Sequence, residues 1–598
     1  MTLRLRPPSA VTSAALLIIL AQLVVRGVFV SRSWFLVDDH IFMADIARGE
    51  DDLAWYTRLH QGHFMPLSFL LVKLVVAVSE PYAWWPVAVE IVVLQALASL
   101  ACWWMLRTVF GPGRVALVGL AVYGTTALTV PALMWWAVAI NQYPHQIAFF
   151  GVVTAHVLYA RTRRVRWVAV AGVFLTVGYL SYAKTGLVVV TVAALTLIWL
   201  VEGRPWDRFW RAVRDFRVAW VVYGALSVAW LVVYVTRPQA AVPARASQFV
   251  ELAQAQLFEA LLPTLVGGPL RWVDFGTGPV QFADPPVVMV VVAATLVAVV
   301  LLHSWGTYER SLLVLWPVGL YLFASAVLVY TGRAYTIGLL GGEGIGIHVQ
   351  YLSDAAPLLL LAGVSLVRSP VDVADPPRRR PVPLVDLVPA VPVRATLVGL
   401  VVLLGLISSA VYADGWRTFD ERTVNQRAIA DLRSHSATRL ADVFAPSTVV
   451  APVLGDKALL RNYFALLDDR YTTSLAGADL QTFDDAGRLR PADVVPVEGA
   501  VAAPAVRGCR PVGTTGRDFR LTPPTVLGPW VAVDYVSARP GTVSVGGIGV
   551  TRVGIAAPAG RHRILAAAPR PLDRVVVTAS AGTSLCVTRV EYGLVAPS

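Results

Sequence analysis

Long apolar stretches separated by short polar segments dominate the first two-thirds of the chain. Windows of roughly 17–22 apolar residues recur between residues 9 and 413, and a helix of that length crosses about 30 Å of hydrocarbon. We expect eleven membrane-spanning helices, at about 9–30, 86–106, 115–134, 145–160, 167–182, 186–201, 218–235, 286–303, 312–330, 355–367 and 395–413. The pattern predicts a polytopic α-helical membrane protein.

One further apolar stretch, MPLSFLLVKLVVAVSEPYAWW, is short and interrupted by Lys73. We expect it to form an external helix that lies against the bundle. If it crossed the membrane, the loop RTRRVR at 161–166 would lie outside, whereas arginine-rich loops usually remain cytoplasmic. By the same rule Arg4 and Arg6 place the N-terminus in the cytoplasm, and eleven spans then place the C-terminus outside it.

The pattern changes after about residue 413. Segment 414–444 has helical spacing with charge on most faces, and we expect it to connect the membrane part to a further domain. Residues 445–598 contain stretches such as WVAVDYVSA and GTVSVGGIGVTRVGIAA, which are typical of short strands between turns. The predicted domains are a transmembrane domain at 1–413 with a first external loop at 31–85, the connector, and an extracytoplasmic β-sandwich of about 100–150 residues at 445–598.

Composition agrees with a membrane protein. Hydrophobic residues make up 56% of the 598 positions and charged residues 15%, whereas a soluble domain of this length exposes more charge. The net charge of +12 would suggest a nucleic-acid partner in a soluble protein. Here the arginines lie in short loops between spans, so we expect a membrane and no nucleic acid as partner.

The three cysteines suggest a compartment. Cys102 lies in an apolar span and is expected to be a small buried hydrophobe. Cys509 and Cys586 lie in the C-terminal part and can form a disulfide if that part is outside the cytoplasm. The first apolar stretch has no convincing cleavage site after it, so we expect a retained helix whose Arg26 extends to the interface.

The segment WFLVDDHIFM places Asp38, Asp39 and His40 where the first span ends. Adjacent carboxylates repel each other, and keeping both ionised near lipid is unfavourable. The simplest interpretation is a solvated loop with a helix-capping Asp. The chemical interpretation is a general base that deprotonates a hydroxyl, with the second Asp orienting it or both holding a divalent cation.

Four other segments combine polar and aromatic residues, and each also has a purely structural interpretation. HFMPLS and YAKTGL offer a histidine and a lysine suited to a phosphate, although both side chains can simply face solvent or the interface. WWAVAINQYPHQ, expected as an external loop, can form a sugar-binding wall or an interfacial aromatic belt. HVQYLSD follows a glycine-rich loop that permits close approach of a ligand. The residues concerned are His63, Lys184, Trp135, Trp136, Asn141, Gln142, His348, Tyr351 and Asp354.

In the expected topology all five segments lie on the outer face of the membrane. The inner loops contain mainly arginine and proline instead. The sequence therefore predicts an external site between lipid and water.

These segments resemble the GT-C superfamily of integral membrane glycosyltransferases. The acidic pair in the first extracytoplasmic loop is typical of that superfamily, and HFMPLSFLLVKL is similar to an H/Y-R-P-L segment in the same loop of several branches. WWAVAINQYPHQ, AKTGL and HVQYLSD are similar to segments of large actinobacterial membrane proteins of this type, which often end in an external β-domain. The resemblance covers residues 1–413 and, weakly, the C-terminal part.

The resemblance implies an activity at the plasma membrane. A sugar on a polyprenyl phosphate would be transferred, with inversion, to a cell-envelope glycan or glycoconjugate on the outer face. Asp38 or Asp39 would be the base; His63, Lys184, Arg333 and His348 would meet the phosphate; His40, Trp135, Trp136, Asn141, Gln142, Tyr351 and Asp354 would shape the sugar and acceptor site. An arginine expected before the tyrosine of the last segment is missing, since Val349 and Gln350 precede Tyr351, and His348 is the substitute.

Three alternatives remain open at this point. An oligosaccharide polymerase or ligase would use external arginines such as Arg237, Arg245 and Arg271, but leaves the acidic pair unexplained. A transporter needs polar residues at mid-membrane, where the spans show only Glu90 and Gln95. A non-catalytic scaffold would tolerate loss of both Asp residues.

Overall fold

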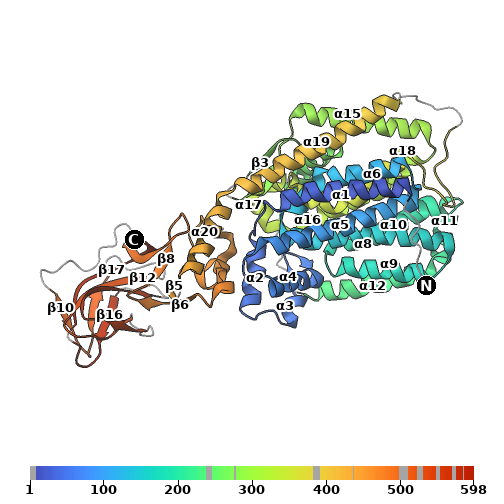
Figure 1. The fold of residues 1–598 in the computed structure, drawn as a ribbon. Helices are drawn as coiled ribbons and strands as arrows, with labels where there is room; N and C mark the ends of the chain where they lie inside the picture. The colour runs from blue at the N-terminus through green and yellow to red at the C-terminus, as the bar shows by residue number, and fades with distance from the viewer. Residues whose placement is uncertain are drawn as a thin grey trace, which may run out of the picture. The chain divides into compact units, whose positions relative to one another are not determined.

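The computed structural model describes residues 9–237, 245–274, 278–380, 391–435, 437–450, 452–496, 509–521, 530–546, 553–568, 574–583 and 585–598. Its contacts divide the chain into two units (Figure 1). The helical unit comprises Met1–Asp39 and Glu50–Phe419, and the sheet unit comprises His40–Gly49 and Asp420–Ser598. A ten-residue piece of the first loop therefore belongs with the C-terminal region.

The helical unit is a bundle of long apolar helices. Its main elements are α1 (Ala10–Val30), α5 (Trp84–Phe110), α6 (Arg114–Thr125), η1 (Ala127–Thr129), α7 (Val130–Met134), α8 (Trp136–Thr162), α9 (Arg166–Tyr179), η2 (Ala183–Thr185), α10 (Gly186–Leu195), η3 (Thr196–Leu200), α11 (Pro205–Asp215), α12 (Arg217–Val235), α15 (Val287–Thr307), η5 (Ser311–Val314), α16 (Leu315–Gly332), α17 (Ala334–Gly346), η6 (Val349–Ala355), α18 (Ala356–Val367) and α19 (Val391–Thr418).

Eight helices among the described residues are long and apolar enough to cross a membrane, or nine if the pair α6 and η1–α7, bent by 48°, forms one span. The chain is therefore a membrane protein with several spans. The expected count of eleven also includes the positions of α8 and α9, which are not among these eight or nine. Helix α4 (Pro66–Val78), the expected external helix, is also shorter than the spans.

The segment WWAVAINQYPHQ is not a loop, as the sequence pattern suggested: Trp135 precedes α8, and Trp136–Gln146 form its first three turns. Pro144 lies inside this helix and cannot donate to the carbonyl of Ile140. The Ser68 hydroxyl of α4 donates to that carbonyl instead, at 2.8 Å. Packing against neighbouring helices buries most of α8, and this tertiary context overrides the local helix-breaking signal.

The glycine-rich stretch before HVQYLSD is also helical rather than a loop. It forms α17, with a kink at Gly341 where φ is 76°, followed by the turn of η6. Because glycine adopts this φ without steric penalty, it permits the bend. The segment before α15, expected as one long loop, contains α13 (Ala246–Ala255), η4 (Gln256–Leu261), α14 (Leu262–Leu265) and the hairpin of β3 (Trp272–Asp274) and β4 (Gln281–Ala283).

Arg26 does not extend to the interface as expected, because it is buried between helices with 3% of its surface exposed. Its guanidinium donates to Gln95 Oε1 at 2.7 Å and Thr129 Oγ1 at 2.8 Å, and also to the carbonyls of Gly124 and Thr126 at 3.1 Å. The two carbonyls lie where α6 ends and have no partner within that helix, so the bend supplies two of the four acceptors of the guanidinium.

The first loop consists of short elements: α2 (Asp38–Ala47), α3 (Leu53–Thr57), β1 (Leu59–His60), β2 (His63–Phe64) and α4. The two strands form a hairpin in which His60 lies opposite His63. Gln61 and Gly62 make the two-residue turn with φ of 50° and 78°. Positive φ at both central residues is the type I′ geometry that closes tight hairpins.

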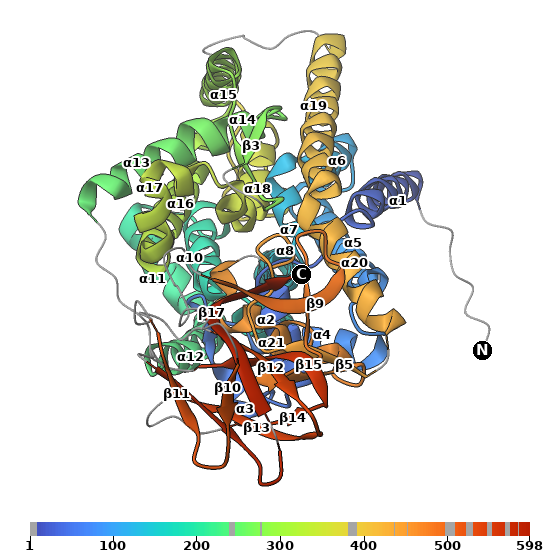
Figure 2. The same cartoon turned by 90° about the vertical axis from the view of Figure 1, so that its left-hand side faces the viewer.

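The sheet unit begins with α20 (Asp420–Ser434). Its strands are β5 (Thr438–Ala441), β6 (Tyr471–Ser474), β7 (Ala476–Gly477), β8 (Gln481–Phe483), β9 (Leu489–Pro496), β10 (Arg510–Val512), β11 (Arg517–Arg520), β12 (Trp530–Ser537), β13 (Gly541–Gly546), β14 (Val553–Ala557), β15 (Gly560–Ala567), β16 (Arg574–Ala579) and β17 (Leu585–Pro597), with η7 (Pro452–Ala458), α21 (Leu460–Tyr463) and η8 (Ala465–Leu467) between β5 and β6. They form a nine-stranded sheet and a four-stranded sheet (Figure 2).

The two sheets share one hydrophobic cluster. It contains Val533 and Tyr535 from β12 of the larger sheet and Val543 and Val577 from the smaller sheet. Such a common core is the arrangement of two stacked sheets. A disulfide joins Cys509 to Cys586, next to the pairing of β10 with β17.

Candidate active site

The two adjacent carboxylates lie in different environments. Both oxygens of Asp39 accept backbone N–H groups, Oδ1 from Ala137 and Oδ2 from Leu36, each at 2.9 Å. The side chain of Asp39 is fully buried. This burial raises the pKa of Asp39 well above its usual value; the charge of Asp38 also raises it, and the two N–H groups oppose the shift. Asp39 thus ties the start of α2 to the start of α8.

Asp38 is more exposed and is paired with a histidine. Its Oδ1 lies 3.1 Å from His60 Nε2, and 18% of the Asp38 side chain is exposed. Burial raises the pKa of Asp38, but the hydrogen bond from His60 and the charges of His60 and Arg333 outweigh that effect, so its pKa is lowered. Asp38 is therefore the member of the pair that stands ionised.

Val37, which precedes the pair, is strained. Its φ of 32° is unusual for a β-branched residue, because Cβ then crowds the backbone. Strain of this kind persists only where the surrounding structure holds the residue in place, and it is common at functional sites.

The hairpin brings two histidines to the site from one turn. His60 contacts Asp38, and His63 stacks on Tyr182 with ring centroids 4.8 Å apart. Burial, with the charges of Arg333, Lys184 and His60, lowers the pKa of His63 well below its usual value, so the ring is neutral. His63 Nδ1 is buried and has no hydrogen-bond partner among the described residues.

Arg333 connects the hairpin to η6. Its Nη1 donates to Gln61 Oε1 at 2.7 Å, and its guanidinium carbon lies 5.7 Å from the centre of the Tyr351 ring. Within the described part of the chain no other nitrogen of Arg333 donates to a protein group. Most donors of Arg333 are therefore free to meet a ligand, and its charge helps to lower the pKa of Asp38.

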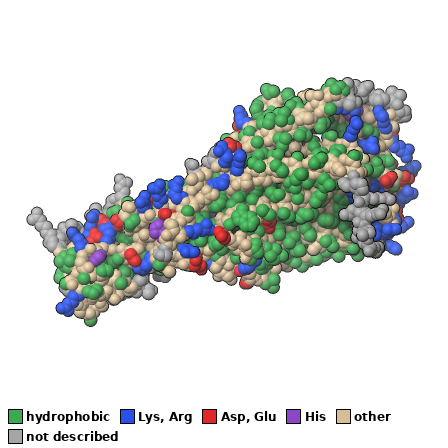
Figure 3. Space-filling model, in the orientation of Figure 1, with side chains coloured by type: hydrophobic (Ala, Val, Ile, Leu, Met, Phe, Trp, Pro, Cys, Tyr) green, Lys and Arg blue, Asp and Glu red, His purple; other side chains and the backbone are tan. Residues whose placement is uncertain are grey.

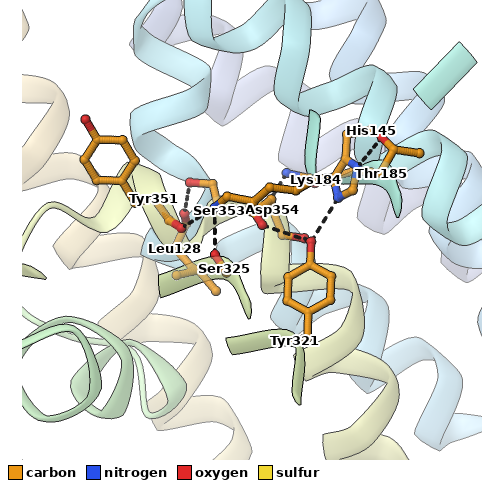
Figure 4. A network of polar contacts seen from close by, with 10 residues as sticks. Leu128, His145, Lys184, Thr185, Tyr321, Ser325, Tyr351, Ser353 and Asp354 are labelled. Carbon is orange, nitrogen blue, oxygen red and sulfur yellow. Dashed lines mark hydrogen bonds and ion pairs between the residues drawn. The ribbon is translucent and has the colours of Figure 1, made fainter. Parts of the chain in front are cut away.

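Lys184 and Asp354 do not face the site as free groups, because they pair with each other at 2.9 Å (Figure 4). Lys184 Nζ also donates to Ser325 Oγ at 2.7 Å and to the Tyr351 carbonyl at 3.1 Å. Asp354 Oδ2 accepts the Tyr321 hydroxyl at 2.9 Å. All three protons of the ammonium group are thus engaged, so the network holds η6 in place.

The network continues into α8. His145 lies 3.2 Å from the Tyr321 hydroxyl through Nε2 and 3.0 Å from Thr185 Oγ1 through Nδ1. Figure 4 shows the Tyr351 ring directed away from the ion pair while its carbonyl meets Lys184. The structure therefore brings three expected segments, AKTGL, HVQYLSD and the α8 segment, together around one set of hydrogen bonds.

Several buried polar atoms near these residues have no hydrogen-bond partner in the described part of the chain. Buried polar groups are nearly always paired, so such atoms need an explanation. A ligand rich in hydroxyl groups would pair with them. They are His63 Nδ1, Trp135 Nε1, Asn141 Oδ1, Gln142 Oε1, His348 Nδ1 and Gln350 Oε1.

Two expected site residues have other partners. Trp136 is fully buried, donates to Glu90 Oε2 at 2.7 Å and packs against Phe35, so it is a core residue and offers no stacking face to a sugar. His40 belongs to the sheet unit, where its Nε2 lies 3.1 Å from the Tyr463 hydroxyl. His348 contacts Phe282 and Tyr351, and burial lowers its pKa to about 3.

Three of the four oxygens of the acidic pair already have a protein partner. Both oxygens of Asp39 already accept backbone protons, and Asp38 Oδ1 is taken by His60. Within the described ranges no group of three or more His, Cys, Asp or Glu side chains is arranged to hold a metal.

Sequence reasoning missed His60, Gln61, Tyr182 and Tyr321. The first two had a readable signal, because LHQGHF places a two-residue turn with glycine between two short strand segments. The two tyrosines had none, since their role follows from packing between helices distant in sequence.

Comparison with known proteins yields little. No protein-family model matches the chain, and no curated protein matches it. Among solved structures it is similar to arabinosyltransferase EmbB from Mycobacterium smegmatis, at 12% identity and a TM-score of 0.28, with 100% of this chain and 66% of that chain covered. This chain thus spans about 66% of the length of that protein, and at this TM-score the similarity does not establish a shared fold.

Proposed function

We propose that the chain is a membrane glycosyltransferase that moves a sugar from a polyprenyl-phosphate donor to an envelope glycan or glycoconjugate. The observation that carries the proposal is Asp38, a carboxylate with a lowered pKa that follows an apolar span, is paired with His60 and is influenced by the charge of Arg333. A base next to a cation is what transfer of a sugar from a phosphate to a hydroxyl requires.

Asp38 is the general base in this proposal. It deprotonates the acceptor hydroxyl, whose oxygen attacks the anomeric carbon of the donor sugar from the face opposite the phosphate. The bond from that carbon to the phosphate oxygen breaks, and the configuration inverts. Asp39 holds Asp38 in position by accepting the backbone N–H groups of Ala137 and Leu36, and it does not act as the base.

The leaving phosphate is bound by Arg333, whose guanidinium has donors to spare. A planar guanidinium suits bidentate binding of phosphate oxygens. His63, neutral and unpartnered at Nδ1, adds a hydrogen bond. Lys184 contributes its charge only, because Asp354, Ser325 and the Tyr351 carbonyl occupy its protons.

The sugar hydroxyls meet the unpartnered side-chain atoms of Trp135, Asn141, Gln142, His348 and Gln350. Amide oxygens and imidazole nitrogens accept hydroxyl protons, and an indole N–H donates. These groups orient a polyhydroxylated ring.

The proposed setting is the plasma membrane, with the N-terminus in the cytoplasm and the sheet unit outside. The disulfide of the sheet unit supports an oxidising compartment for that unit. The acceptor glycan then approaches from the same side as the acidic pair.

Membranes that contain wild type, Asp38→Asn or Asp39→Asn test the proposal. Each is incubated with radiolabelled polyprenyl-phosphate sugars and envelope glycan extract, at equal protein level. We expect transfer by wild type, a loss of at least about 100-fold in Asp38→Asn, and residual transfer in Asp39→Asn wherever that variant folds. Asp485→Asn, at an exposed position of the sheet unit, is the matched control.

Unchanged transfer in Asp38→Asn would exclude it as the base. A lipid-linked oligosaccharide in the same panel identifies a polymerase or ligase if it alone is consumed. Absence of transfer with every donor, from protein that melts cooperatively, would contradict the proposed activity.

A further inference from the structure

Helix α11 directs its apolar side away from the protein. Trp206, Phe209, Trp210 and Val213 are 69%, 44%, 49% and 40% exposed. Their spacing of three and four residues places them on one stripe of the helix. In a water-soluble protein such a stripe would be buried. Its exposure here indicates that an apolar environment outside the chain covers it.

The position of α11 in the chain determines where this stripe lies. The helix connects the span Ala183–Leu200 to the span Arg217–Val235 with only a few residues on either side. It therefore lies where two spans leave the hydrocarbon. Aromatic side chains favour that boundary, because their rings are apolar and their N–H groups remain hydrated.

Arginines of α11 border the stripe. Arg204, Arg211 and Arg214 are exposed, and none of them makes an ion pair within the described ranges. Arg208 is used differently, since it pairs with Asp375, which also pairs with Arg310. That shared carboxylate attaches the loop after α18 to α11.

A second arginine-rich loop joins the same surface. Arg163 Nη1 donates to the carbonyl of Asp215, the last residue of α11, at 2.8 Å, and its guanidinium lies 4.6 Å from the Phe216 ring. Arg164 and Arg166 follow it and are exposed. Figure 3 shows Lys and Arg side chains gathered at the end of the helical unit where Figure 1 places α11.

We propose that α11 and these arginines form a binding surface for anionic phospholipids. The aromatic stripe inserts at the level of the upper acyl chains, parallel to the membrane plane, as interfacial amphipathic helices do. The guanidinium groups of Arg204, Arg211 and Arg214 bind headgroup phosphates, with Arg164 and Arg166 beside them. Charge complementarity selects anionic over zwitterionic headgroups.

The first test measures lipid selectivity. Full-length protein in nanodiscs of equal phosphatidylglycerol and phosphatidylcholine is released into the gas phase, and the retained lipids are counted by native mass spectrometry. We expect wild type to retain phosphatidylglycerol preferentially. In Arg204→Gln/Arg211→Gln/Arg214→Gln we expect the ratio of retained phosphatidylglycerol to phosphatidylcholine to be at least about fivefold smaller. Arg517→Gln/Arg520→Gln/Arg539→Gln, with the same charge change in the sheet unit, is the control.

Inorganic phosphate at millimolar concentration distinguishes a lipid site from a site for the free anion. If the surface binds lipid, phosphate leaves the retained phosphatidylglycerol unchanged. Displacement by phosphate, equal loss in the control variant, or no preference in wild type would each overturn the proposal.

The second test locates the stripe. A spin label at Trp210→Cys, in a Cys102→Ser background, is compared with one at Asp215→Cys, an exposed position on the opposite side of the helix. We expect the label at 210 to collide with oxygen more than with a water-soluble nickel chelate, and the label at 215 to do the reverse. Equal nickel access at both positions, or protection of 210 from both reagents by a protein partner, would contradict insertion into lipid.

Discussion

Asp38 and Asp39 are neighbours in sequence, yet the structure gives them different partners and opposite pKa shifts. A sequence pattern identifies the pair and its place at the end of a span, because both are properties of a local stretch. It cannot separate the two side chains, since the difference depends on the Ala137 N–H and on His60, which come from other segments.

Replacing His60 tests how Asp38 is tuned. The pKa of Asp38 is lowered, so the base is ionised above that pKa and activity falls as the pH falls through it. In His60→Gln the charge of His60 is gone, although the amide can still donate to Asp38, and burial remains. We therefore expect the acid limb of kcat/KM to move to higher pH. The pH–rate profile of His435→Gln, an exposed histidine of the sheet unit, is the control, and an unmoved limb in His60→Gln would show that His60 does not tune the base.

The Lys184–Asp354 pair offers a second test at this scale. Removing one partner leaves a buried charge unpaired, which costs about 3–5 kcal/mol, whereas two apolar side chains are tolerated better. We expect Lys184→Met and Asp354→Leu each to lower the melting temperature, and the double variant to be more stable than the sum of both changes predicts. Thermal melting in detergent measures this, with the exposed pair Arg417–Asp414 as control. Additive effects would show that the pair is not coupled.

At the scale of elements, eight or nine of the eleven expected spans are long apolar helices, whereas the conformation of two candidate site segments was not predictable. Runs of apolar residues identify a span by length alone. The α8 and α17 segments were expected as loops because they contain polar residues, proline and glycine. The α8 segment is helical because neighbouring helices bury it and because Ser68 replaces the missing backbone donor at Pro144. The α17 segment is helical with a kink at Gly341.

The Ser68–Ile140 hydrogen bond can be tested through Pro144. In Ser68→Ala the buried carbonyl of Ile140 loses its donor, which costs about 1–3 kcal/mol. In Ser68→Ala/Pro144→Ala the new N–H at position 144 can donate to that carbonyl, so part of the stability returns. Melting temperatures of wild type, Ser68→Ala, Pro144→Ala and the double variant measure the effect. A double variant less stable than Ser68→Ala would contradict this account of the proline.

At the scale of the whole molecule, the sequence indicates a membrane part followed by a strand-rich part, but not that the two are interleaved. His40–Gly49 belongs to the sheet unit, where Asp45 pairs with Lys457 at 2.5 Å and Arg48 donates to Asn462 at 2.7 Å. No local pattern in residues 40–49 reports partners more than 400 positions away. The sheet unit thus holds the residues that directly follow the acidic pair.

The disulfide should matter for this unit alone. Removing a native disulfide typically costs about 2–5 kcal/mol. We expect Cys586→Ser to lower the resistance of the sheet unit to proteolysis in urea, while the helical unit keeps its melting temperature. Cys102→Ser, at a buried free cysteine, should instead affect the helical unit. Equal effects of Cys586→Ser on both units would mean that they unfold together.

The burial of Arg26 has a consequence for how the protein is made. An arginine in a spanning helix is unfavourable by about 2.5–3.5 kcal/mol at the centre of the bilayer, and Arg26 lies one turn before the end of α1. Its partners Gln95, Gly124, Thr126 and Thr129 are synthesised some 70–100 residues later. We therefore expect the arginine of the first helix to remain near the water, at the insertion machinery, until α5, α6 and η1 have been synthesised. The segment that enters the membrane first is then among the later ones to complete its packing.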